Sequence, residues 1–565
     1  MDILRIIGAL LFLIFFFGFC IFIHELGHFL AAKWRGLHII AFSLGFRKFW
    51  SKKINGVEYR LGYLPFGGYV ELPQVDSSGI PTDENGNELP QAKPFDRICT
   101  AVAGPLFNVL FGLSLGCLVW WFGVPQDSPK MKSVTVSRID TSGPEYAAGL
   151  RSGDKIYKLN GKTFNWTWNE FIQSTMLAVG NITLEIERGS VKQSISYTPH
   201  AGSPFANPEL RREKIAYPFF IPQIPITLFP EKDSPAARAG VERGDIVLEL
   251  NSEPAFSLED FQNQIDLLSG KPFDLKVKRG EEIVLIKGIQ PEVYQVPDME
   301  PDYKCGFVYS RDKVPFEIVD TVPGMPAAEA GLKAGDRVVK INGTSIKGPN
   351  ELTEIIQNSK GAPLKLDLMR DGKALSITMT PREMKHYTIG AETAIYNYPS
   401  PFQQFAYTID LSYKSLRGIF FGLAKKIGLT ESGSTIGFRN LSGPLGMGRV
   451  LFVSVYRGSF MYGIYFVVII SFALAIFNIL PLPVLDGGHT TLALLEIIFR
   501  RKIPEVVIRY ISYCFVTLLV GLMVFVTLMD IQRMLPTKTE PTDYSKLKLE
   551  DANVSAESNS PDQDK

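Results

Sequence analysis

The chain has 565 residues, a net charge of +1 and 21% charged residues. This near-neutral charge gives no indication of nucleic-acid binding. The spacing of the five cysteines suggests neither a disulfide framework nor a metal site. The length predicts several folding units, and the slightly positive mean hydropathy indicates that apolar residues are concentrated in part of the chain.

Uncharged runs account for that concentration, and each is near or above the roughly 20 residues that an α-helix needs to cross a bilayer. The runs cover residues 6–23, 98–126, 458–485 and 510–529. They predict transmembrane helices within segments 1–32, 98–126, 458–489 and 506–530. The first run does not have the form of a cleavable signal peptide, because no small-residue cleavage site follows it.

Basic residues predict the orientation. Lysines and arginines dominate the first part of the loop at 33–97, and Arg500, Arg501 and Lys502 follow the third run. Both loops are therefore predicted to be cytoplasmic, which places the large region between the second and third runs, and both termini, outside the cytoplasm. The polar, acidic tail at 536–565 is predicted to be disordered.

The first run ends in "HELGH". His24 and His28 are four residues apart, so on a helix they share one face and could bind one zinc ion. Glu25 lies beside them and could take a proton from water at the metal. The alternative is a pair of incidental histidines at a helix end, which the membrane setting disfavours because ionisable groups there are usually functional. Catalytic zinc also needs a third protein ligand.

Three stretches with the same landmarks follow the second run. Asp154, Asp245 and Asp336 are 91 residues apart, and an asparagine follows each of them by six residues. This repetition predicts three α+β domains, at 130–200, 220–292 and 305–385. The pattern of short helix, glycine, strand, longer helix and two strands resembles the PDZ domain, which accepts an extended peptide at a sheet edge. The alternative is a passive spacer that only limits access.

The segment at 400–450 begins with apolar residues every three or four positions, which predicts an amphipathic helix. Such a helix could lie on the outer membrane surface, against the repeats, or in ordinary core packing.

The third run ends in "NILPLPVLDGGH", residues 478–489. Asp486 is the first charge after 28 uncharged residues, and Pro481 and Pro483 predict a break in the helix just before it. Asp486 is the candidate third ligand and His489 is a weaker rival. The alternative is an aspartate that simply emerges at the cytoplasmic surface.

Taken together, these motifs resemble the site-2 protease family: HExxH in the first span, "AGPLFN" at 103–108 in the second, and "NILPLPVLDG" in the third. The repeats and the four-span layout are similar to its bacterial regulator-of-sigma-E protease type, although the best-known members carry two PDZ copies rather than three. The resemblance implies a polytopic α-helical membrane protein with a membrane-re-entrant β-hairpin and extracytoplasmic PDZ-like domains. "VEYRLGYLPFGGYVEL", at 57–72, fits the hairpin; the alternative is an ordinary cytoplasmic hairpin.

The resemblance also implies roles for particular residues. His24, His28 and Asp486 would be the zinc ligands, and Glu25 the general base. Residues that would handle substrate are Asn478, Pro481, Pro483, Gly67, Gly68 and Tyr69. Gly104 and Asn108 match the second-span motif that packs near the active site.

The expected function is zinc-dependent intramembrane proteolysis at the bacterial inner membrane. The resemblance implies single-span substrates that a site-1 protease has shortened, such as an anti-sigma factor, or remnant signal peptides, with PDZ-like domains holding back untrimmed proteins. A membrane-anchored PDZ scaffold with a dead metal site is one alternative, but all the presumed functional residues are present. A cytosol-facing metalloprotease with soluble substrates is another, and the position of Asp486 argues against it.

Overall fold

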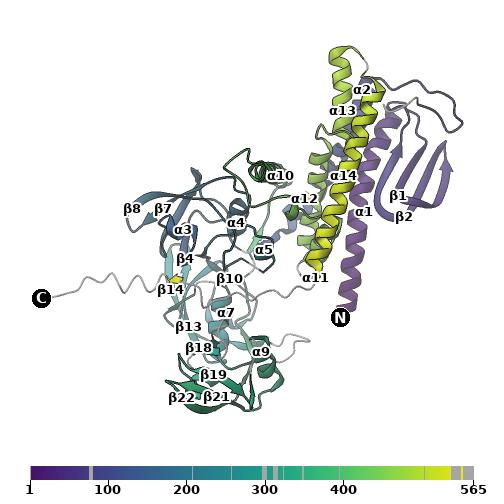
Figure 1. Cartoon of the computed structure of the whole chain (residues 1–565). Coiled ribbons are helices and arrows are strands. Elements are labelled where there is room, and N and C mark those ends of the chain that lie inside the picture. Colours follow the sequence, from purple (N-terminus) through teal and green to yellow (C-terminus); the bar gives the residue numbers. More distant parts are fainter. Residues whose placement is uncertain are drawn as a thin grey trace. The chain divides into compact units, whose positions relative to one another are not determined.

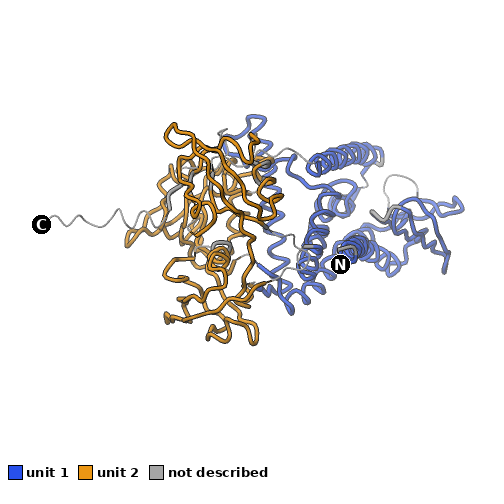
Figure 2. The backbone as a smooth tube through the Cα atoms, turned by 90° about the horizontal axis from the view of Figure 1, so that it is seen from below, with its two compact units in different colours: residues 1–126, 396–537 blue, residues 127–395, 538–565 orange. Residues whose placement is uncertain are grey.

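The computed structural model describes residues 2–75, 81–126, 128–206, 208–255, 258–294, 302–309, 316–321, 324–345, 349–393, 395–457, 459–501, 503–535 and 549–551. The chain divides into two compact units (Figure 2). Unit 1 comprises Met1–Gln126 and Tyr396–Thr537, and unit 2 comprises Asp127–Ile395 and Lys538–Lys565.

Unit 1 is built mainly from helices (Figure 1). They are α1 (Asp2–Trp34), α2 (Pro94–Phe122), α10 (Pro401–Lys426), a 3-10 turn η1 (Phe438–Asn440), α11 (Pro444–Arg457), α12 (Phe460–Asn478), α13 (Asp486–Phe499) and α14 (Glu505–Met534). Within the described residues, four stretches are long and apolar enough to cross a membrane: Leu4–Trp34, Pro94–Phe122, Phe460–Asn478 and Val506–Met534. These stretches confirm the four predicted spans. A short strand, β3 (Val124–Gln126), follows α2 and pairs with β26 (Ile395–Asn397).

Helix α2 is the packing centre of unit 1, since α1, α10, α12 and α13 all contact it. Glycines allow the closest approaches: a Cβ on Gly27 would lie 2.4 Å from the Ala103 carbonyl oxygen, and one on Gly112 would lie 2.5 Å from the Phe472 ring. Small residues serve this purpose in membranes, where helices associate through close packing rather than through a hydrophobic drive.

The third span is interrupted where the prolines predicted a break. Helix α12 ends at Asn478 and α13 begins at Asp486. Between them Val484 has φ 80°, an unfavourable conformation for a β-branched residue. A Cβ on Gly487 would lie 2.2 Å from a backbone oxygen of this turn, and one on Gly488 would lie 2.3 Å from another. The two glycines after Asp486 therefore allow the chain to fold tightly back on itself.

The loop between α1 and α2 forms a more elaborate sheet than the expected hairpin. Strands β1 (Ala41–Ile54) and β2 (Val57–Glu71) each bend, so that residues 41–44 pair with both 58–61 and 68–71, while 50–54 pair with 57–61. The simple hairpin is thus corrected to four paired segments: 50–54 with 57–61 and 41–44 with 68–71 are antiparallel, whereas 41–44 runs parallel to 58–61. The alternating pattern indicated strands but could not reveal the bends, which depend on irregular pairing around 45–49.

Helix α10 divides its apolar residues between two environments. The Phe405 ring packs 5.0 Å from the Phe472 ring, measured between centroids. Phe402, Tyr413 and Phe420 are exposed instead. The apolar residues of α10 therefore lie partly in the core, and the exposed ones form a surface suited to contact with lipid.

Unit 2 contains the three repeats, each with its own hydrophobic core. The first contains β4 (Val134–Asp140), α3 (Pro144–Ala147), β5 (Lys155–Leu159), β6 (Lys162–Thr163), α4 (Trp168–Met176), β7 (Ile182–Arg188), β8 (Val191–Tyr197), α5 (Pro208–Arg212) and β9 (Phe220–Gln223). The second contains β10 (Ile226–Pro230), α6 (Pro235–Ala239), β11 (Asp245–Leu250), β12 (Glu253–Pro254), α7 (Leu258–Leu267), β13 (Phe273–Arg279) and β14 (Glu282–Ile289). The third contains β17 (Phe307–Tyr309), β18 (Phe316–Thr321), α8 (Pro326–Glu329), β19 (Arg337–Ile341), β20 (Thr344–Ser345), α9 (Pro349–Asn358), β21 (Leu364–Arg370) and β22 (Lys373–Met379).

The third repeat is inserted into the second rather than following it in tandem. Strand β25 (Ala391–Glu392) comes after the third repeat and pairs with β10 of the second, whose core also takes in Ile389. Two ladders mark the crossing points: β15 (Glu292–Tyr294) pairs with β24 (His386–Thr388), and β16 (Asp302–Lys304) with β23 (Arg382–Met384). The expected second domain at 220–292 is therefore corrected: it also needs residues 386–392. Its expected beginning is also wrong, because β9 pairs with β4 of the first repeat.

The repeated aspartates have a structural role. Asp336 is fully buried, and its carboxylate accepts hydrogen bonds from the Arg370 guanidinium at 2.6 and 2.7 Å and from the Lys333 backbone N–H at 2.8 Å. Asp154 and Asp245 make the same contacts in their repeats. Burial opposes ionisation, but these hydrogen bonds hold the pKa of Asp336 below its usual value. The aspartate therefore ties the start of one strand to the end of another.

Most of the tail predicted to be disordered, at 536–565, lies outside the described residues. Leu549–Asp551 form β27, which pairs antiparallel with Arg138–Asp140 of β4. These three residues thus depart from the expected disorder.

Candidate metal and active site

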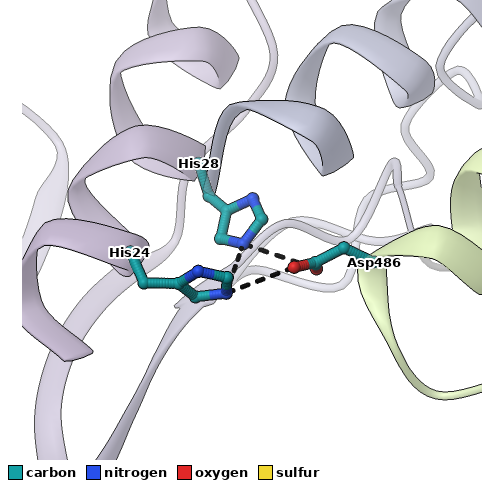
Figure 3. Close-up of side chains that lie close together, drawn as sticks. All are labelled: His24, His28 and Asp486. Carbon is teal, nitrogen blue, oxygen red and sulfur yellow. Dashed lines mark hydrogen bonds and ion pairs between the residues drawn. The ribbon is translucent and has the colours of Figure 1, made fainter. Parts of the chain in front are cut away.

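His24 and His28 lie one turn apart on α1, and their imidazoles converge on the Asp486 carboxylate (Figure 3). His24 Nε2 is 3.2 Å from Asp486 Oδ2, His28 Nε2 is 3.4 Å from Asp486 Oδ1, and the two Nε2 atoms are 3.2 Å apart. The side chains are mostly buried, with 11–20% of their surfaces exposed. The structure thus brings together three residues that were proposed from separate motifs.

The local fold explains why Asp486 reaches the histidines. It occupies the first turn of α13, directly after the tight segment at 479–485, and a carboxylate is favoured at a helix N-terminus. A buried ion pair also joins α13 to α2, since Arg97 donates to Glu496 at 2.8 Å. Sequence reasoning missed this pair, because nothing local links two residues that are 399 positions apart.

The three side chains fit a zinc ion. Zinc in proteins is bound at about 2.0–2.2 Å, so the edges of a tetrahedral site measure about 3.3 Å. The 3.2 Å between the two Nε2 atoms matches such an edge. Each Nε2 atom also lies within such a distance of one carboxylate oxygen of Asp486, at 3.2 Å from Oδ2 for His24 and at 3.4 Å from Oδ1 for His28. Two imidazoles and a carboxylate are also ligands that zinc accepts in catalytic sites. No other cluster of this kind occurs among the described histidines, cysteines and acidic residues.

Glu25 lies beside the cluster and lines a cavity of about 1170 Å³ together with His24, His28 and Asp486. The end of β2 borders the same cavity through Tyr69, Val70 and Glu71, and Leu72, directly after the strand, lines it too. A carboxylate next to a metal-type cluster in a cavity of this size is placed to exchange protons with a bound molecule.

The residues predicted to handle substrate are spread around the cluster. The Asn478 side-chain nitrogen lies 3.3 Å from His24 Nε2, and Pro483 lines the cavity. Pro481 is exposed and is absent from the described lining of the cavity. His489, the rival ligand, lines the cavity but is not part of the three-residue cluster.

The glycines of β2 permit close contacts. A Cβ on Gly68 would lie 3.0 Å from the Glu25 side chain and 2.9 Å from the Ser43 carbonyl oxygen. Gly67 has φ 111°, and a Cβ there would lie 2.4 Å from the Phe46 ring. Gly68 therefore lets this strand approach the candidate base.

Helix α2 forms another wall of the site. A Cβ on Gly104 would lie 2.3 Å from His28 Nε2 and 2.9 Å from the His24 ring. The Asn108 side chain lies 3.3 Å from His24 Nδ1, and the Thr100 carbonyl oxygen lies 2.8 Å from His28 Nδ1. Thr100 was not predicted, because a backbone carbonyl leaves no signal in residue type.

Four apolar spans and a buried cluster of two histidines and one aspartate define a membrane-embedded metalloprotease. The chain belongs to peptidase family M50, whose family model matches residues 12–522. The predicted site-2 protease family is thereby confirmed, and the protein is a zinc metalloprotease of the site-2 type.

Full-length relatives agree with this assignment. The "Regulator of sigma E protease" of Haemophilus influenzae is 23% identical, with 91% of this chain and 96% of that protein covered. "Protease RseP" of Yersinia pestis is also 23% identical, with 90% and 95% covered. A Vibrio cholerae protein, whose name places it provisionally among the zinc metalloproteases, is 24% identical, with 86% and 90% covered.

Proposed function

We propose that this protein cleaves a peptide bond within the transmembrane segment of a substrate, with His24, His28 and Asp486 as zinc ligands and Glu25 as the general base. The observation that carries the proposal is the convergence of all four side chains on one cavity in the membrane-spanning unit. When bound, zinc supplies Lewis-acid activation of water and of the peptide carbonyl.

Glu25 performs the proton transfers. Its carboxylate takes a proton from the attacking water and delivers it to the amine nitrogen that leaves when the peptide bond breaks. Asn478 lies near the histidines with a donor group pointing inward, so it is placed to hold a substrate carbonyl. The base, Glu25, is thus on α1, and the residue that would position the substrate, Asn478, is at the end of α12.

The strand at 68–71 provides a place for unwound substrate. It pairs with 41–44 on one side, and its residues Tyr69, Val70 and Glu71 line the cavity. A substrate helix must open before its backbone can be attacked, and its freed N–H and C=O groups need partners in lipid. An exposed sheet edge supplies such partners by strand addition. Exposed aromatic residues of the same sheet, including Phe49 and Tyr63, suit entry into the membrane.

The names of the relatives support a substrate of the anti-sigma-factor type. We propose single-span proteins of that kind, already shortened by a site-1 protease, with remnant signal peptides as a second group. The three repeats are proposed to be PDZ-like domains that select or hold back such proteins. The basic loops support an inner-membrane location with the site near the cytoplasmic side and with both termini and the repeats outside the cytoplasm.

The test is cleavage of a membrane-tethered reporter whose outer domain has been removed. The reporter is co-expressed with the parent protein or with Glu25→Gln, and Glu431→Gln, an exposed glutamate of the same unit, is the matched control. The parent and the control should release the shorter cytoplasmic product, and Glu25→Gln should not. Equal cleavage by Glu25→Gln would sink the proposal. Binding of the reporter without cleavage by the parent would favour a scaffold.

A further inference from the structure

Asn108 lies on α2, directly behind the first histidine of the cluster. Its side chain is fully buried, and its amide nitrogen is placed 3.3 Å from His24 Nδ1. Its amide oxygen has no hydrogen-bond partner among the described residues, although it too is buried. A buried polar atom without a partner calls for an explanation, because removing it from water is unfavourable unless a hydrogen bond replaces the one lost.

The chemistry of His24 supplies that explanation. Its Nε2 atom faces Asp486 and His28, so this nitrogen is the one that meets the metal. A neutral imidazole that gives one nitrogen to a metal carries its hydrogen on the other nitrogen. Nδ1 is then a donor and needs an acceptor, whereas an amide nitrogen offers only another donor. The nitrogen and oxygen of an asparagine amide are interchangeable in placement. Turning the Asn108 amide over gives Nδ1 its acceptor and the amide oxygen its donor, and the amide nitrogen then takes the position that the oxygen held.

We propose that Asn108 is a positioning residue that fixes His24 as a zinc ligand: its amide oxygen accepts the hydrogen of Nδ1 and thereby directs Nε2 to the metal. This inference rests on the proposed zinc site and adds a function for a residue of the second span. Hydrogen bonds to the outer nitrogen of a ligating histidine set its tautomer and ring orientation.

His28 is held in the same way, which supports the assignment. Its Nδ1 donates to the Thr100 carbonyl oxygen at 2.8 Å, while its Nε2 faces Asp486. Thr100, Gly104 and Asn108 are spaced four residues apart, so they share one face of α2. That face contributes one acceptor for each histidine and, at Gly104, the space for both rings.

Zinc affinity of the purified full-length protein in detergent tests the proposal, measured by competition with a chelator of known affinity. Asn108→Leu keeps the shape of the side chain but removes the acceptor, and it should weaken zinc binding 10- to 100-fold. Asn108→Asp keeps an acceptor oxygen and should stay within a few-fold of the parent. Ser471→Ala is the matched control, because Ser471 donates to the Asn108 backbone oxygen at 2.9 Å and does not contact the histidines.

The outcomes separate this inference from the proposed function. A parent protein that binds no zinc, or a His24→Ala variant that binds it equally well, would refute the metal site itself. Parent-like affinity in Asn108→Leu would overturn the role of Asn108. Equal losses in the Leu and Asp variants, or in Ser471→Ala, would also overturn it by showing that packing matters rather than the acceptor. If Asn108→Leu does not purify as a folded protein, Asn108→Ala compared with Asn108→Asp gives the same contrast.

Discussion

Gly104→Ala should weaken the metal site although it removes no ligand. The new Cβ would lie 2.3 Å from His28 Nε2, 2.5 Å from His28 Cε1 and 2.9 Å from His24 Cε1. Favourable contacts begin at about 3.5 Å, so the His28 ring would have to retreat by about 1 Å. Its Nδ1 is tied to the Thr100 carbonyl oxygen, and Gly27 already sits against the Ala103 backbone. Neither the ring nor helix α1 can move without losing another contact.

The cost follows from this crowding. An added methyl group in a well-packed core typically costs about 1–3 kcal/mol. If that cost falls on the arrangement that binds metal, zinc affinity drops by about 5- to 150-fold, because 1.4 kcal/mol corresponds to a factor of ten. Proteolysis should fall further, since a misplacement of about 1 Å can cost 100-fold in rate.

Two glycine variants serve as controls, with zinc affinity and reporter cleavage as the measurements. Gly18→Ala is on α1 and has nothing within 4 Å of the new Cβ, so it should resemble the parent. Gly112→Ala forces the same α2 against the Phe472 ring at 2.5 Å but away from the ligands, so it should disturb stability more than zinc affinity. Parent-like affinity in Gly104→Ala would refute the reasoning, and so would an equal loss in Gly112→Ala.

Further predictions concern the third ligand and the repeats. Asp486→Asn should lose most of its bound zinc, measured as metal content after purification, because a neutral amide is a poor zinc ligand; unchanged content would point to His489 or water instead. Burial raises the pKa of Glu145, in the first repeat, to about 7. The folded state therefore favours the protonated carboxyl, and stability should fall by about 3 kcal/mol as pH rises from 4.5 through 7. Hydrogen exchange of the first repeat measures this pH dependence of stability, which Glu145→Gln should flatten. A pH dependence as steep in Glu145→Gln as in the parent would contradict the burial argument. Asp336→Asn should destabilise the third repeat by about 2 kcal/mol, because it weakens the pairing of a buried carboxylate with a partly exposed arginine. Hydrogen exchange of β18–β22 would show this, with the exposed Asp371→Asn as control.

Much of unit 1 could be predicted because the bilayer constrains the composition of short, continuous stretches of sequence. Uncharged runs marked the spans, and "HELGH" and "LDG" stood out as polar groups where burial is expensive. Pro481 and Pro483 predicted the break in the third span before Asp486. The contact of Thr100 with His28 could not be predicted, because Thr100 acts through its backbone carbonyl. The Arg97–Glu496 ion pair could not be predicted either, because its helices are far apart in the sequence.

The repeats show a different limit. Their shared landmarks revealed three copies, and the structure explains the aspartates through the Asp336–Arg370 type of ion pair. The path of the chain between copies remained hidden, because β25 is only two residues long and carries no pattern of its own. The bends of β1 were hidden for a related reason, since alternation specifies a strand but not where it turns.

The insertion of the third repeat into the second also sets an order of assembly during synthesis. When residues 226–289 have emerged into the compartment in which they fold, the sheet they form still lacks the strand at 391–392 and the buried Ile389. The inserted repeat is synthesised as one continuous stretch from 302 to 384, so it can complete its own core first. Domains generally fold as units while the chain emerges. The second repeat must then wait for more than a hundred residues before it closes, and its open edge needs protection from wrong pairing throughout that time.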